Sequence, residues 1–152
     1  MGRFNHTAIA LFFTAVLLGG CSTIKLYKDV LPQNLVVDSR IESVEATLDI
    51  YSVNGQCETD YKGTVILDRK NLELGIATGI PSYLVVGFAG SSFWGNSSSF
   101  ISYDFTLVPR KAHQYEIEVS YIDDIYHIAL YETNQNTGSK REMADNELAN
   151  CR

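Results

Sequence analysis

Residues that bind metals or carry redox chemistry are scarce in this chain. Its 152 residues include only three cysteines and three histidines, and no two cysteines follow a CxxC spacing. Structural zinc sites need four such ligands, usually in closely spaced pairs, so the pattern argues against a zinc centre. The glycine-rich residues 90–95 contain no lysine, which argues against a phosphate-binding loop. We therefore expect no metal and no cofactor.

Basic residues are also few. The chain has 12 lysines and arginines against 18 aspartates and glutamates, a formal net charge of −6. Proteins that bind nucleic acid, or that adhere to anionic lipid by charge alone, carry a basic surface. The composition argues against both kinds of partner.

A segment long enough to span a membrane is missing as well. The mainly apolar residues 8–18 are followed by two glycines, whereas a helix needs roughly 20 apolar residues to cross a bilayer. A short apolar run behind a cation, here Arg3, is typical of the hydrophobic region of a secretory signal peptide. We expect such a signal at residues 1–20.

Leu18, Gly19, Gly20 and Cys21 follow the apolar run directly. They resemble the lipobox of bacterial lipoprotein precursors, in which a branched aliphatic residue and two small residues precede the modified cysteine. The resemblance implies cleavage before Cys21, diacylglycerol on its thiol and an acyl chain such as palmitate on its amino group. More than one acyl chain anchors a protein stably to a membrane.

Ser22 follows the cysteine where an aspartate often marks retention at the inner membrane. For this family, the difference implies an outer-membrane lipoprotein whose body faces the periplasm. Two alternatives stay open: a secreted protein that is cleaved elsewhere, and a signal anchor that is not cleaved.

Cys57 and Cys151 remain as an even pair once Cys21 is lipidated. Exported proteins mature in an oxidising compartment, so we expect one disulfide between them. The two cysteines are 94 residues apart. The chain-entropy model gives a loop of that length about 4 to 5 kcal/mol of stabilisation before strain is subtracted.

The rest of the chain divides into two parts. Residues 21–43 are weakly periodic and polar, so we expect a lipidated tether, with a short strand near Leu35 as its only regular element. Residues 44–152 are of single-domain size, and we expect them to form one domain.

Apolar patterning predicts strands at residues 44–50, 64–67, 72–77, 83–88 and 101–107. We expect the second and third of these to form a hairpin. The fourth is a continuous apolar run, which is typical of a central strand that is buried on both faces.

The clearest pattern lies between residues 115 and 131. Asp123 and Asp124 are expected to form the turn of a hairpin. One register separates apolar from polar pairs, whereas a slip of one residue would mix them. That register pairs Tyr121 with Tyr126, Val119 with Ile128 and Ile117 with Leu130 on one face, and Ser120 with His127, Glu118 with Ala129 and Glu116 with Tyr131 on the other.

Six to eight short strands with little helix predict an all-β fold, an antiparallel β-sandwich of immunoglobulin-like or transthyretin-like type. A closed barrel is the alternative. We also expect a short C-terminal helix over residues 140–150. The stretch FTLVPRKAHQY, residues 105–115, resembles the strand, proline turn and tyrosine strand of several small bacterial sandwich lipoproteins of unknown function.

Two groups of residues invite a catalytic or metal-binding interpretation. The expected hairpin places Ser120 and His127 opposite each other, with Glu118 diagonal to them, which is superficially like a catalytic triad. A flat two-stranded surface offers no oxyanion hole, so a polar sheet face is the better interpretation. Asp123 and Asp124 would suit calcium, but adjacent carboxylates at such a position usually favour a turn.

Residues 90–99 contain the strongest candidate for partner binding. Phe93 and Trp94, the only tryptophan, lie there among glycines and serines that cannot bury them locally. The alternative is that the pair folds back and caps the core. Arg110 and Lys111 form a small cationic cluster on an acidic chain, which would suit an anionic partner.

We therefore expect a non-enzymatic lipoprotein, anchored to the outer membrane, that acts as an accessory or recognition module for another envelope protein. An inhibitor or immunity protein against a periplasmic hydrolase or toxin is the alternative. A small hydrolase is the weakest of the three hypotheses.

Overall fold

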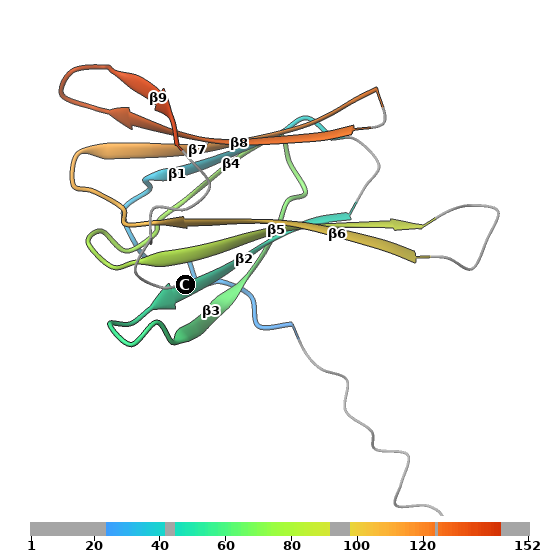
Figure 1. Ribbon diagram of the computed structural model, residues 1–152, viewed down its shortest axis with the longest axis horizontal. Coiled ribbons are helices and arrows are strands. Elements are labelled where there is room, and N and C mark those ends of the chain that lie inside the picture. Colours follow the sequence, from blue (N-terminus) through green and yellow to red (C-terminus); the bar gives the residue numbers. More distant parts are fainter. Residues whose placement is uncertain (1–23, 42–44, 92–97, 124, 144–152) are drawn as a thin grey trace, which may run out of the picture.

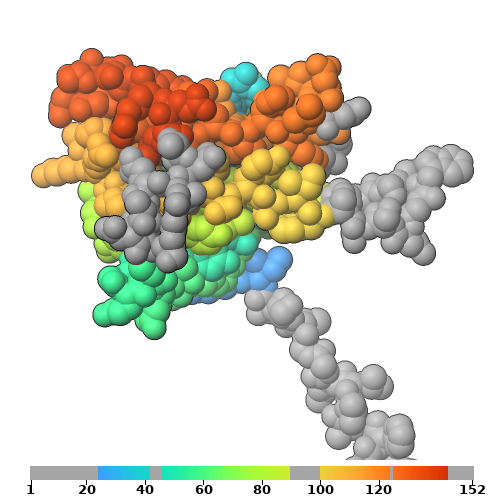
Figure 2. Space-filling model, viewed as in Figure 1, coloured from blue at the N-terminus to red at the C-terminus, as the bar shows by residue number. Residues whose placement is uncertain are grey.

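The computed structural model describes residues 24–41, 45–91, 98–123 and 125–143, and these residues form an all-β fold. Two sheets, of four and five strands, lie face to face (Figure 1). The predicted β-sandwich is therefore confirmed. The space-filling view shows the two layers, with the orange and red strands of one sheet above the green strands of the other (Figure 2).

The four-stranded sheet has the order β3-β2-β5-β6, and every pair in it is antiparallel. Its inward side chains alternate along each strand, as period-two patterning predicts. The strands are β2 (Glu45–Val53), β3 (Thr59–Ile66), β5 (Ser82–Ser91) and β6 (Ser98–Leu107).

The five-stranded sheet has the order β4-β1-β7-β8-β9. Its strands are β1 (Leu35–Ser39), β4 (Asn71–Leu74), β7 (His113–Ile122), β8 (Ile125–Asn134) and β9 (Lys140–Glu142). β1 runs parallel to β7, whereas the other pairs are antiparallel. The sheet is therefore mixed rather than purely antiparallel.

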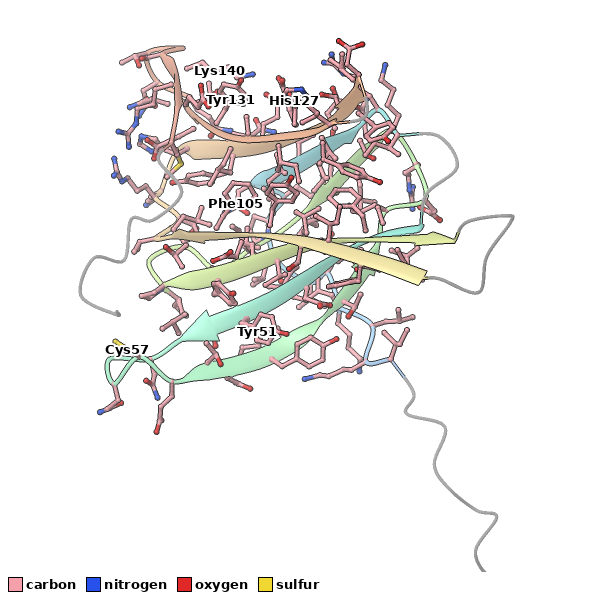
Figure 3. The ribbon with its side chains drawn as sticks, turned by 45° about the vertical axis from the view of Figure 1, so that its right-hand side comes forward. Tyr51, Cys57, Phe105, His127, Tyr131 and Lys140 are labelled. Carbon is pink, nitrogen blue, oxygen red and sulfur yellow. The ribbon has the colours of Figure 1, made fainter. Side chains whose placement is uncertain are left out.

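The hydrophobic core lies between the two sheets. Leu48, Leu84, Phe105 and Leu107 line it from the four-stranded sheet, and all are at most 3% exposed. The five-stranded sheet contributes inward side chains from each of its longer strands, among them Leu35, Val37, Leu74, Tyr115, Ile117, Val119 and Leu130. Figure 3 shows Phe105 between the layers.

The predicted hairpin of β7 and β8 is confirmed in its register. Ser120 pairs with His127, and Ile117 pairs with Leu130. Asp123 lies in the turn with a positive φ of 51°, a conformation that aspartate tolerates better than most residues. The segregation of polar and apolar faces was sufficient to fix this pairing.

Two expectations about the strands were wrong. β3 and β4 do not form a hairpin, because β3 pairs with β2 in one sheet and β4 pairs with β1 in the other. β5 is central, as predicted, but it is not buried on both faces. Tyr83 and Val85 are half-buried, because no further sheet among the described residues packs on the outer face of the four-stranded sheet.

Two expectations about the chain ends also need correction. The short strand expected near Leu35 is confirmed as β1, but it is a buried strand inside the five-stranded sheet and not part of a tether. Residues 140–150 were expected to form a helix. Lys140–Glu142 instead pairs with β8 as β9, and residues 144–150 lie outside the described part of the chain.

Residues 24–31, the N-terminal segment, cross the open side of the sandwich next to β3. Leu26 forms a parallel bridge with Thr64, and the Tyr27 amide donates to the Thr64 carbonyl at 2.9 Å. The Tyr27 hydroxyl then donates to the Gly75 carbonyl at 2.6 Å, just after β4. The segment thus connects the edges of both sheets.

Gly75 permits this close approach. A Cβ atom at Gly75 would lie 2.5 Å from the Leu31 carbonyl oxygen and 2.7 Å from the Leu31 Cβ. Backbone atoms cannot give way as a flexible side chain can. Any larger residue must therefore displace the N-terminal segment.

We expect Gly75→Ala to lower the free energy of unfolding by about 1 to 3 kcal/mol, because of the overpacking against Leu31. Urea denaturation measures the change. Gly55→Ala is the matched control, since nothing lies within 4 Å of a Cβ at that position. A Gly75→Ala variant as stable as the control would contradict the described packing of the segment.

Candidate functional site

Exposed apolar side chains gather at one end of the sandwich. The β5–β6 and β7–β8 hairpins both end on the right-hand side of Figure 1. The side chains near these two tips that are more than 40% exposed are Phe100, Ile101, Tyr121, Ile122 and Ile125, which we call the tip surface. Phe100, at 69%, is the most exposed of them.

Aromatic contacts link the two halves of the tip surface. Ile101 pairs with Phe88 on β5, and the Phe88 ring stacks on Tyr126 of β8 with centroids 4.7 Å apart. Tyr126 in turn lies 4.7 Å from Tyr121. The two tips are therefore joined across the sheets by packed rings, which fixes their relative position.

The structure describes one of the two pairs of residues that were predicted to bind a partner. Phe93 and Trp94 lie outside the described residues, in the connection between β5 and β6. Arg110 and Lys111 follow the opposite end of β6, which is nine residue steps long, or about 30 Å.

Arg110 belongs to a buried ionic cluster around Glu132. The carboxylate is 3% exposed and accepts hydrogen bonds from the Tyr115 hydroxyl at 3.0 Å and from Arg141 Nε at 2.7 Å. Arg110 Nε lies 3.7 Å from the same carboxylate, and the Arg110 amide donates to the Tyr115 hydroxyl. The cluster fixes the turn between β6 and β7 against β8.

The predicted pairing of β7 and β8 was enough to place Glu132 in the core. The register of β7 and β8, extended by one pair beyond Tyr131, places Glu132 opposite Tyr115 on the inward face. A carboxylate at an inward position must be paired, because an isolated buried charge is costly. Its partners come from other strands and turns, so the sequence alone does not identify them.

The surroundings of Glu132 and Tyr115 shift the pKa of both side chains. Burial alone raises the pKa of Glu132, but the hydrogen bonds from Arg141 and Tyr115 and the two arginine charges outweigh it, so the pKa is lowered overall. Burial, with the nearby Glu132 carboxylate, raises the pKa of Tyr115 to about 12. At neutral pH the cluster therefore holds an ionised Glu132 and a neutral Tyr115.

The triad-like group does not assemble into a catalytic site. Ser120 and His127 face each other as predicted, on the outward face of the sheet (Figure 3). Glu118 lies 3.5 Å from Lys140 Nζ, which also bonds Glu116 at 2.6 Å and sits 4.3 Å from the centre of the Tyr131 ring. Within the described residues, His127 makes no hydrogen bond to Ser120 or Glu118.

Two further predictions concern a metal site and the disulfide. The described ranges contain no group of three or more His, Cys, Asp or Glu side chains that could hold a metal ion. Cys57 is disulfide-bonded. Its expected partner, Cys151, lies outside the described residues, so the pairing stays a prediction.

Comparisons with protein families, curated proteins and solved structures give no match to this chain. The choice between an immunoglobulin-like and a transthyretin-like sandwich therefore stays a prediction. Across the part of the chain that the structure covers, no helix has the length and apolar character to cross a membrane.

We expect Glu132→Gln to lower the free energy of unfolding at pH 7 by about 1 to 3 kcal/mol, because two arginines lose their buried partner. A lowered pKa stabilises the fold above the unfolded-state value, about 4.3, and this contribution is lost as the pH falls through the folded-state pKa. The variant should therefore lose less stability than the wild type between pH 6 and pH 3.

Urea denaturation across this pH range tests the prediction. Glu142→Gln, on the exposed strand β9, is the matched control and should keep the acid dependence of the wild type. Parallel pH profiles for the Glu132→Gln variant and the wild type would refute the assigned role of the cluster.

Proposed function

We propose that this protein is a non-enzymatic recognition module of the bacterial envelope, lipidated at Cys21 and held at the outer membrane with its sandwich facing the periplasm. Its partner is another envelope protein, which it contacts through the tip surface. The lipobox-like residues support the anchor, and the tip surface supports the recognition role.

The tip surface is the observation that carries the proposal. Five apolar side chains stand 41 to 69% exposed on two hairpins whose positions are fixed by packed rings. Exposed apolar side chains beside polar residues such as Asp123 suit a protein contact site at this end of the sandwich, although alternation along the strands places Phe100 on the outer face of one sheet and Ile122 and Ile125 on the outer face of the other. Phe93 and Trp94 come between β5 and β6 in the sequence, and their part in partner binding stays a prediction.

A non-enzymatic role is consistent with the described side chains. The one pairing of a serine with a histidine lies on an outward sheet face, and the buried carboxylate Glu132 is neutralised by arginines. A nucleophile requires a positioned base and a site for the developing negative charge. Neither is assembled within the described residues.

Cys21→Ser should abolish acylation of the protein, because the modified thiol is lost. Metabolic labelling with an alkyne palmitate analogue and fractionation of the envelope measure the effect. We expect labelling of the wild type and almost none of the variant. A variant that is still labelled would show that Cys21 is not the lipidated residue, whereas sedimentation of an unlabelled variant would show that its uncleaved signal peptide holds it in the membrane.

Replacing Ile122 and Ile125 with serine should abolish crosslinking to the partner in intact envelopes. Both side chains are more than half exposed, so the fold should tolerate the change. Truncation of central apolar contact residues typically costs 2 kcal/mol or more of binding, about a 30-fold loss of affinity.

Val30→Ser is the matched control, because Val30 is 83% exposed and adjoins Leu31, which packs on Gly75 at the end of the sandwich opposite the tips. Circular dichroism must show equal folding of all variants. The proposal predicts a specific crosslinked protein with the wild type and the control only. The same crosslinks from every variant would rule out the tip surface, and a captured hydrolase or toxin would identify the protein as an inhibitor.

A further inference from the structure

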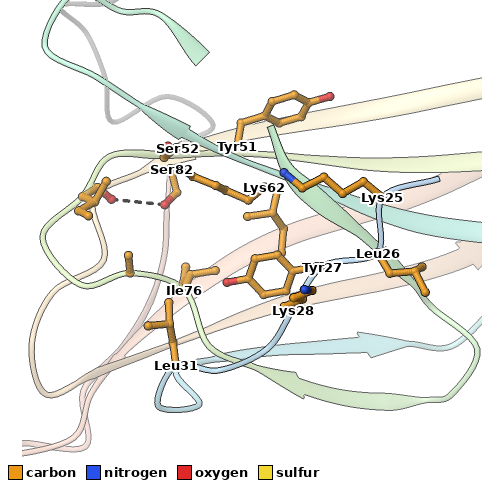
Figure 4. Close-up of a pocket in the computed structure, with 13 residues that line it drawn as sticks. Lys25, Leu26, Tyr27, Lys28, Leu31, Tyr51, Ser52, Lys62, Ile76 and Ser82 are labelled. Atoms are coloured by element: carbon orange, nitrogen blue, oxygen red, sulfur yellow. Dashed lines mark hydrogen bonds between the residues drawn. The ribbon is translucent and has the colours of Figure 1, made fainter. Parts of the chain in front are cut away.

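An apolar pocket lies at the opposite end of β5 from the tip surface. It has a volume of about 480 Å³ and opens between the N-terminal segment, the end of β2 and the start of β5 (Figure 4). β5 is nine residue steps long, so about 30 Å separate its two ends. A ligand in this pocket and a partner at the tips would therefore not compete for the same residues.

The walls of the pocket come from three separate parts of the chain. Leu31 and the Tyr27 ring line it from the N-terminal segment, Ile50 from β2, and Ile76 and Ile80 from the connection between β4 and β5. The hydrogen bonds of Tyr27 to Thr64 and Gly75 hold one wall in place. A volume of this size falls in the range of small-molecule binding sites.

The charge at the pocket is opposite to that of the whole chain. Lys25, Lys28 and Lys62 line it, and none of its 13 lining residues is acidic. The complete sequence has six more acidic than basic residues. Lys62 pairs with Asp60, which offsets its charge, and Asp29 accepts a hydrogen bond from the Gly75 amide next to Leu31. Lys25 donates to the Tyr61 carbonyl, so Lys25 and Lys28 supply most of the net positive charge at the rim.

We propose that this pocket binds a single-chain amphiphile with an anionic head group, such as a long-chain carboxylate. The apolar walls would remove the chain from water, and the three lysines would contact the head group at the rim. An apolar surface next to several cations favours such a molecule over a neutral or cationic one. The pocket volume favours one chain over a diacyl lipid.

The test uses the mature chain, residues 21–152, with Cys21→Ser so that no attached acyl chain can occupy the pocket. Isothermal titration compares decanoate and decyltrimethylammonium, each below its critical micelle concentration, with decanol below its solubility limit. We expect decanoate to bind roughly tenfold more tightly than decanol, and the cationic probe to show no saturable binding.

Two variants measure separately what the apolar walls and the lysines at the rim contribute to binding. Ala77→Trp fills the pocket from a half-buried position and should abolish binding of decanoate. The triple variant Lys25→Gln, Lys28→Gln and Lys62→Gln should weaken decanoate roughly tenfold and leave decanol nearly unchanged. Lys70→Gln removes an exposed lysine of the β3–β4 connection and should change neither affinity.

Equal affinity for the three probes, or decanoate binding that survives Ala77→Trp, would overturn the proposal. If Ala77→Trp fails to fold, the triple lysine variant decides, because its substitutions lie at the rim. A final measurement tests binding of the protein to phosphatidylglycerol vesicles. Binding to these vesicles without binding of free decanoate would show a membrane contact of the lysines, and that result would also overturn the pocket assignment.

Discussion

Strand β1 holds the five-stranded sheet together, because β4 and β7 both pair with it and not with each other. Its five residues supply Leu35 and Val37 to the core, and neither side chain is exposed to solvent. Because β4 pairs with β1 and β3 pairs with β2, the chain between β3 and β4 crosses from one sheet to the other. The N-terminal segment, which precedes β1, therefore crosses the open side of the sandwich between β3 and β4.

This arrangement gives the two ends of the molecule different chemistry. At one end, two hairpin tips are joined by the stacked rings of Phe88 and Tyr126 and expose apolar side chains. At the other end, the N-terminal segment closes over an apolar pocket with a cationic rim. A buried cluster around Glu132 fixes the β6–β7 turn by charge rather than by apolar packing. The account therefore assigns protein recognition to one end and ligand binding to the other.

Local pattern was sufficient for the sandwich class and for the β7–β8 hairpin, because adjacent strands with one apolar face admit a single register. It failed for β1 and β4, whose pairing joins residues from distant parts of the chain. The Glu132 cluster and the pocket were missed for the same reason, because their residues come from distant parts of the chain. Arg110 was placed with Lys111 in a cationic cluster that would suit an anionic partner, and the structure pairs it with Glu132. The pocket combines four segments that no local motif connects.

The central claim is that the tip surface is covered by a partner in the envelope. Oxidative footprinting of Phe100 and Tyr121, in the purified protein and in intact envelopes, tests it most directly, with Tyr61 on β3 as the internal reference. The account predicts that both tip residues are protected in envelopes while Tyr61 is labelled to the same extent in both samples. Equal labelling of all three residues in both samples would contradict it.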